Sequence, residues 1–127
     1  MRVFQSLAVA TAVLAAPANA GAIRAYDAAV FHALQARNAP TIVFVHADWC
    51  PICRAQEKTI GKLIATPEYR GVTVLTIDYD TQKPLWTSFG AQKQSTLIAF
   101  HGRRETARLA YDANPQKVTN LVASTLR

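Results

Sequence analysis

The sequence predicts an α/β fold, a three-layer sandwich in which helices flank a central mixed sheet. Helix-like and strand-like patterns alternate along residues 21–127, as such a sandwich requires. A helical crossover connects the first two predicted strands and makes them parallel, whereas a short turn joins the last two and makes them antiparallel. One sheet therefore contains both kinds of strand pair.

The amino-terminal segment, residues 1–20, is predicted to be a secretory signal peptide. Met1-Arg2 gives it a positive start, an apolar run extends from Leu7 to Ala16, and Ala18-Asn19-Ala20 supplies the small residues of a cleavage site. The apolar run is too short to span a bilayer. Residues 21–127 then form a single domain, which we expect in the periplasm or outside the cell, where disulfides persist.

Composition excludes two other classes of protein. The formal net charge is +6, but the basic residues are scattered, and Arg103-Arg104, in a predicted turn, is the one local cluster. Because no basic stripe with interleaved aromatic residues is present, we expect no nucleic-acid partner. Two cysteines are too few for a disulfide scaffold.

The first half of the domain contains two predicted helices around a buried strand. Asp27 caps a helix that ends near Asn38. Its apolar face consists of Val30, Phe31 and Leu34. Thr41–His46 is β-rich without alternation, as expected of a central strand that is buried on both faces. A second helix runs from Pro51, which is tolerated in the first turn, to about Ala65.

The second half adds a strand, a short helix, a hairpin and a terminal helix. Val72–Asp78 is the strand and Lys83–Phe89 the short helix. Thr96–Phe100 and Thr106–Tyr111 flank a turn and form the hairpin. Asn114 caps the terminal helix. The inward residues predicted for this helix are Val118, Leu121, Val122 and Leu126.

Cys50 and Cys53 are the only thiols, and they stand between the buried strand and the following helix. A cysteine at a helix start faces unpaired backbone N–H groups and the positive end of the dipole, which favour its thiolate. Cys50 is therefore the predicted nucleophile, with Cys53 one turn behind it.

Two other roles for the pair are weaker. A purely structural disulfide would close so small a loop that it would constrain the unfolded chain little. Zinc would need two further ligands, and the only histidines are His32, His46 and His101, of which His32 and His101 are predicted at the surface. We predict no metal site, although a copper-carrying or redox-inactive binding module remains the alternative.

Two neighbours of the pair have two readings each. His46, at the strand end, is either a partly buried hydrogen-bonded residue or a cation that stabilises the Cys50 thiolate when protonated. Trp49 is either a shield and docking surface beside the sulfurs or a core residue.

The segment Ala47-Asp48-Trp49-Cys50-Pro51-Ile52-Cys53, with Ile77-Asp78 and Phe89-Gly90, resembles thioredoxin-fold proteins, and the likeness extends over residues 22–127. The cysteine motif is especially similar to the periplasmic C-terminal domain of the bacterial transmembrane disulfide reductase. The resemblance implies a monomeric thiol–disulfide oxidoreductase without a bound cofactor, whose redox-active disulfide exchanges with cysteine-containing exported proteins. It also favours the reductive direction, with a membrane partner as electron donor.

Three positions depart from the family pattern. Phe44 and Val74 stand where the family has a buried Asp and a Lys that relay protons. Gln94-Ser95-Thr96 stands where a cis-proline shapes the substrate groove and discourages metal capture. A cis bond before a residue other than proline costs about 3 kcal/mol, so we expect Ser95 in the trans form, with its hydroxyl near Cys50.

Overall fold

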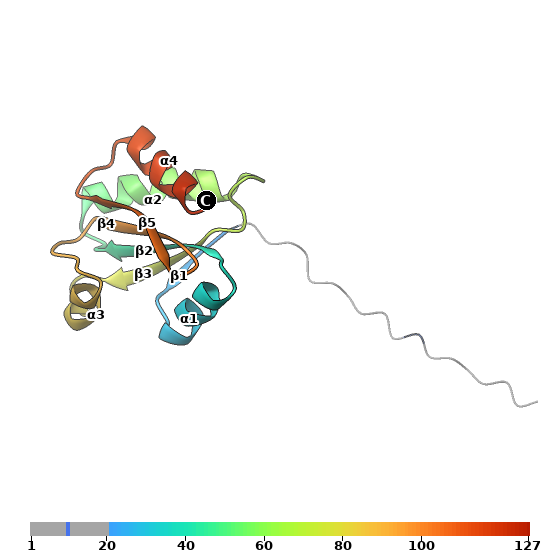
Figure 1. Ribbon diagram of the computed structural model, residues 1–127. Coiled ribbons are helices and arrows are strands. Elements are labelled where there is room, and N and C mark those ends of the chain that lie inside the picture. The colour runs from blue at the N-terminus through green and yellow to red at the C-terminus, as the bar shows by residue number, and fades with distance from the viewer. Residues whose placement is uncertain (1–9, 11–20) are drawn as a thin grey trace, which may run out of the picture.

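The computed structural model describes residue 10 and residues 21–127. Except for Ala10, the predicted signal peptide lies outside the described residues. The described domain is a five-stranded sheet covered by helices on both faces, as Figure 1 shows. The predicted α/β sandwich is therefore confirmed.

The sheet is mixed, with strand order β1-β3-β2-β4-β5. The strands are β1 (Ala22–Ala25), β2 (Pro40–His46), β3 (Thr73–Asp78), β4 (Thr96–His101) and β5 (Arg104–Ala110). β1 and β2 pair with β3 in parallel, whereas β4 is antiparallel to both β2 and β5. β2 is central and buried on both faces, which explains why its sequence is apolar without alternation.

Four helices form the outer layers: α1 (Ala28–Ala36), α2 (Pro51–Ile64), α3 (Lys83–Ser88) and α4 (Pro115–Ser124). In Figure 1, α2 and α4 lie on one side of the sheet, and α1 and α3 lie on the other. Asp27 and Asn114 cap α1 and α4 by accepting backbone N–H groups, as their sequence positions predict. These caps fix where α1 and α4 begin.

Two buried clusters form the core, one on each face of the sheet. The face under α2 and α4, here called the sulfur face, includes Phe44, Cys50, Cys53, Ile60 and Val118. The face under α1 and α3, here called the aromatic face, includes Phe31, Val43, Leu75, Trp86 and Phe100. Successive residues of β2 contribute to opposite faces, because side chains alternate across a strand.

Three details differ from the sequence-based expectations. β1 was not predicted, because its four residues are exposed and show no buried period. The hairpin turns at Gly102-Arg103, so β4 extends to His101 and β5 begins at Arg104 rather than Thr106. Gly102 has a φ of +59°, and a Cβ there would lie 2.6 Å from the Asn38 side chain, so this tight turn requires glycine.

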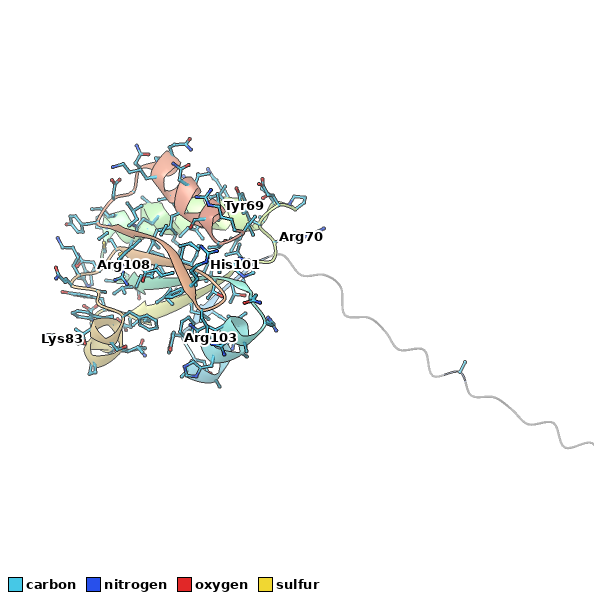
Figure 2. The ribbon with its side chains drawn as sticks, viewed as in Figure 1. Tyr69, Arg70, Lys83, His101, Arg103 and Arg108 are labelled. Carbon is cyan, nitrogen blue, oxygen red and sulfur yellow. The ribbon has the colours of Figure 1, made fainter. Side chains whose placement is uncertain are left out.

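The carboxyl end of the domain also departs from expectation. α4 ends at Ser124, and Leu126 is 42% exposed, so the predicted inward role of Leu126 is wrong. His101 is not a surface turn residue: it ends β4, and its Nδ1 lies 2.8 Å from the Thr125 carbonyl oxygen. Figure 2 shows His101, Arg103 and Arg108 along the β4–β5 hairpin.

Strand register brings three loops together at the same end of the strands. His46 at the end of β2 pairs with Asp78, and Val45 pairs with Thr96 at the start of β4. Thr96 in turn pairs with Ala110 at the end of β5. The loops that follow β2, precede β4 and follow β5 therefore meet. Within the described residues, no helix is long and apolar enough to cross a membrane.

Candidate active site

Cys50 is the N-cap of α2, and Pro51 occupies its first turn. The Cys50 backbone is extended, with φ −90° and ψ 113°, and its Sγ accepts the Cys53 backbone N–H at 3.2 Å. A proline is favourable here because the first N–H groups of a helix have no intrahelical partner. The sulfur therefore takes the place that an oxygen fills at most helix starts.

The pKa values of the two thiols are shifted in opposite directions. Burial opposes ionisation of Cys50, but hydrogen bonds from the Cys53 thiol, the Ser95 hydroxyl and backbone N–H groups outweigh it and lower the pKa of Cys50. Burial is also the largest influence on Cys53, and together with the neighbouring Cys50 it raises the pKa of the Cys53 thiol. Cys50 is therefore the more acidic of the two thiols, and ionisation of the pair favours a thiolate on Cys50 with the proton kept on Cys53.

Both cysteines are buried free thiols, with 2% of Cys50 and 0% of Cys53 exposed. Cys50 lies at the start of α2, whereas Cys53 lies one turn inside it. This order suits attack by Cys50 and a later, internal reaction of Cys53.

Ser95, which precedes β4, lies directly against both cysteines. Its Oγ is 3.0 Å from the Cys50 Sγ and 3.0 Å from the Cys53 Sγ, and the residue is 0% exposed. No peptide bond among the described residues is cis, so the trans form expected for Ser95 is observed. Ser95 instead has a φ of +60°, a left-handed conformation that costs a residue with a side chain about 1–3 kcal/mol.

Gln56, one turn after Cys53 in α2, was not predicted as a site residue. It is 0% exposed, and its Nε2 donates to the carbonyl oxygens of Ser95 and Asp112 at 3.1 and 2.9 Å. Its Oε1 is buried without a hydrogen-bond partner among the described residues. A signal existed in the sequence, because Gln56 is a polar residue on the same helical face as Ile60.

The structure places His46 beside carboxylates. Its Nε2 lies 3.1 Å from Glu57 Oε2 and its Nδ1 lies 3.6 Å from Asp48 Oδ1. Within the described part of the chain, its polar side-chain contacts are these two acids and neither sulfur. An influence of protonated His46 on the Cys50 thiolate therefore acts through space and not through a hydrogen bond.

Trp49 is an exposed aromatic residue at the rim of the site. Its side chain is mostly in solvent, with 55% of the residue exposed, so the core reading of Trp49 does not apply. Its Nε1 donates to both Asp80 carboxylate oxygens, at 3.2 and 2.9 Å. It meets Tyr79 edge-on at 6.3 Å, and Tyr79 stacks on Trp86 at 5.1 Å. This row of rings links the rim to the aromatic face.

The other predicted site residues surround this centre. Ile52 is partly buried against the sulfur face. Gln94 is half-buried, and Thr96 is buried with its Oγ1 donating to the Lys93 carbonyl. Phe44 and Val74 are 0% exposed on the sulfur face, so hydrocarbon fills the positions at which the family resemblance places a proton relay.

The surroundings of the sulfurs offer few metal ligands. Among the described residues, no group of three or more His, Cys, Asp or Glu side chains gathers where it could hold a metal ion. A pocket of about 220 Å³ lies beside the site and is lined by His46, Asp48, Asp78 and Asp80 among others, but by neither cysteine. The copper alternative therefore rests on two sulfurs alone.

The sheet order, the helical layers and the paired thiols at the start of α2 define a thioredoxin-like thiol–disulfide oxidoreductase. The model of the AhpC/TSA family matches residues 18–124. The chain belongs to the AhpC/TSA family, which confirms the thioredoxin-like resemblance.

Relatives agree with this class. The chain is 31% identical over 91 residues to a putative thioredoxin-5 of Dictyostelium discoideum, a match that covers 71% of this chain and 86% of that protein. Among solved structures, Trxlp from Edwardsiella tarda is 35% identical with a TM-score of 0.75, and the match covers 80% of this chain and 98% of Trxlp. The thioredoxin of Malassezia sympodialis, at 17% identity and a TM-score of 0.69 over 83% of this chain and 94% of that one, shares the fold.

Proposed function

We propose that this protein is an exported oxidoreductase that exchanges its Cys50–Cys53 pair with the cysteines of other exported proteins. The observation that carries the proposal is the unequal acidity of the thiols: the pKa of Cys50 is lowered and that of Cys53 is raised. A thiolate is the attacking species in exchange, and a protonated second thiol avoids competing with it.

The proposed reaction has two steps. The Cys50 thiolate attacks one sulfur of a partner disulfide, so a mixed disulfide forms, the partner's sulfur–sulfur bond breaks, and the second partner sulfur leaves as a thiolate. Cys53 then gives up its proton to solvent or to a departing thiolate, and its sulfur attacks Cys50. The Cys50–Cys53 bond forms, the first partner sulfur leaves, and two electrons have passed to the partner.

Export and the reductive direction rest on the sequence. The predicted signal peptide, residues 1–20, supports a periplasmic or secreted location, where a membrane partner would return electrons to the pair. The reductive direction is supported by the likeness of Ala47–Cys53 to the transmembrane reductase. We propose a monomer that needs no bound cofactor and no nucleic acid.

Substitution of each cysteine tests the two roles. In insulin reduction, we expect Cys50→Ala to abolish activity, because the remaining thiol, Cys53, is fully buried and its pKa is raised. Cys53→Ala should instead accumulate mixed disulfides that are released by dithiothreitol. Full activity in Cys50→Ala, or trapping by Cys50→Ala rather than Cys53→Ala, contradicts the assignment.

The direction is tested by the reduction potential of the protein. A value of about −270 mV indicates a reductant and a value of about −120 mV an oxidant. Metal analysis of the protein purified without chelators tests the copper alternative. One copper per chain in Cys50→Ser/Cys53→Ser would show that the thiols are not its ligands, whereas copper lost with the thiols would favour the binding module.

A further inference from the structure

The Ser95 hydroxyl lies between the two reacting sulfurs, 3.0 Å from each. A hydroxyl carries one proton and accepting lone pairs, so it can donate to one sulfur while it accepts from the other. Donation to the Cys50 thiolate leaves a lone pair that can accept the Cys53 S–H whenever this proton is not donated directly to Cys50. This arrangement suits the reduced pair once the more acidic Cys50 has ionised and Cys53 keeps its proton.

The backbone holds Ser95 in this position against its own preference. The φ of +60° is strained, yet Ser95 N–H donates to the Val45 carbonyl at 2.8 Å. The Ser95 carbonyl accepts Tyr111 N–H at 2.9 Å and Gln56 Nε2 at 3.1 Å. Three hydrogen bonds from β2, α2 and the loop after β5 therefore fix the residue that carries the hydroxyl.

Oxidation removes both reasons for the bridge. Formation of the Cys50–Cys53 disulfide takes the proton from Cys53 and the negative charge from Cys50. A disulfide sulfur donates no hydrogen bond, and as a neutral acceptor it is weaker than a thiolate. Because Ser95 is 0% exposed, water does not readily replace the lost partners.

We propose that the Ser95 hydroxyl bridges the two sulfurs of the dithiol and shifts the redox equilibrium of the pair toward that form. This inference rests on the proposed exchange function and adds the residue that sets its balance. In exchange with glutathione, two glutathione thiols reduce the protein disulfide and become one glutathione disulfide. The protein gains two electrons and two protons, and above the pKa of Cys50 one of these protons passes to solvent. Ser95 makes the protein a stronger oxidant than the same chain without the hydroxyl.

The test is the equilibrium constant of the full-length protein with a glutathione buffer, measured by alkylation of free thiols. Ser95→Ala removes the hydroxyl and should shift this constant about tenfold toward the disulfide, which corresponds to a potential lower by about 30 mV. Ser95→Gly also removes the hydroxyl but tolerates the positive φ, so it should shift in the same direction. Ser124→Ala is the control, because this buried serine bonds to the Leu121 carbonyl and Thr106, away from the sulfurs.

A second readout separates the hydroxyl from a general structural effect. The ultraviolet absorbance of the thiolate should show that Cys50 titrates at higher pH in both Ser95 variants and at the wild-type pH in Ser124→Ala. A shift in Ser95→Gly that is absent in Ser95→Ala would assign the effect to backbone strain, which only glycine relieves, and would overturn the inference. Unchanged constants in both variants, with normal exchange by the wild type, overturn the role of Ser95 alone. Failure of the wild type to form a reversible disulfide overturns the proposed function as well.

Discussion

The two faces of the sheet bury different kinds of side chain. On the aromatic face, the Phe31 ring lies 5.4 Å from Phe100 and 5.5 Å from Phe89, in edge-on contacts that bury large apolar surfaces. On the sulfur face, two thiols, the Ser95 hydroxyl and the Gln56 amide are buried together. The first face gains stability from packing, whereas the second accepts polar atoms and backbone strain where the reaction takes place.

This difference shows that the residues that contribute most to stability and the residues that take part in the reaction lie on opposite faces of β2. Residues of the aromatic face should affect unfolding and leave exchange intact. Residues around the sulfurs should act mainly on exchange and on its proton balance, with smaller effects on stability. The predictions below test that division.

Phe31→Ala should have the largest effect on stability. Phe31 is 6% exposed at the centre of the aromatic contacts, so its truncation should lower the free energy of unfolding by about 3–5 kcal/mol. Urea denaturation followed by circular dichroism measures this loss, and insulin reduction per folded molecule should not change. His32→Ala, at an exposed position on the same helix, is the control and should stay within about 0.5 kcal/mol of wild type. A loss of exchange activity in folded Phe31→Ala would contradict the division.

Trp49→Ala should act on partner binding. Because Trp49 is 55% exposed, its removal should change stability little, but an exposed aromatic residue beside the sulfurs provides contact area for a protein partner. We expect kcat/KM for insulin to fall about tenfold, or about 1.4 kcal/mol of transition-state stabilisation. The rate with a small disulfide, which does not reach Trp49, should remain close to wild type. Equal losses with both substrates would show that Trp49 acts on Cys50 itself.

Gln56→Met should have a smaller effect, and it should change both the stability of the fold and the redox equilibrium of the thiols. The variant loses the donors to Ser95 and Asp112 but also removes the unpaired Oε1, so we expect a stability loss of about 1 kcal/mol. Looser holding of Ser95 should shift the glutathione equilibrium toward the disulfide, in the direction of Ser95→Ala. Lys58→Met, at an exposed position of the same helix, is the control. An unchanged equilibrium would show that the backbone bonds of Ser95 suffice without Gln56.

The fold could be predicted from the sequence because its elements carry local signals. Asp27 and Asn114 cap helices, and the uninterrupted apolar run of β2 indicates a central strand. β1 has no such signal: its residues are exposed, and only its pairing with β3 defines it as a strand. Pairing between distant segments is a property of the tertiary structure, so a short exposed edge strand escapes a local pattern.

The site could be predicted only in part for the same reason. The spacing and context of Cys50 and Cys53 indicated their chemistry before any geometry was known. The sequence also placed Ser95 near Cys50, but the positive φ and the contact with both sulfurs depend on hydrogen bonds from three separate elements. The role of Gln56 could not be predicted, because it depends on the contact between its face of α2 and the loop that contains Ser95.

The smallest expected effect is on the pH dependence of stability, and it separates the two thiols. The folded-state pKa of Cys50 is lowered, so between that pKa and the ordinary thiol value of about 8.5 the unfolded chain binds more protons, and stability rises with pH. The folded-state pKa of Cys53 is raised, so above about 8.5 the folded protein binds more protons, and stability falls. The free energy of unfolding of the reduced protein, taken relative to that of the disulfide form, should therefore be greatest at about pH 8.5, because neither thiol titrates in the disulfide form.

Urea unfolding of both redox forms across this pH range measures the difference, and groups common to both forms cancel. Cys50→Ala forms no internal disulfide and is compared with the reduced wild type. It should lack the rise below about pH 8.5, because it removes the group whose folded form holds its proton less tightly. Cys53→Ala should lose the fall above that pH. Phe31→Ala should lower the whole curve without changing its shape, because an aromatic ring has no proton to exchange. A change of shape in Phe31→Ala, or none in Cys50→Ala, would mean that the two faces of the sheet are not separate in the way proposed.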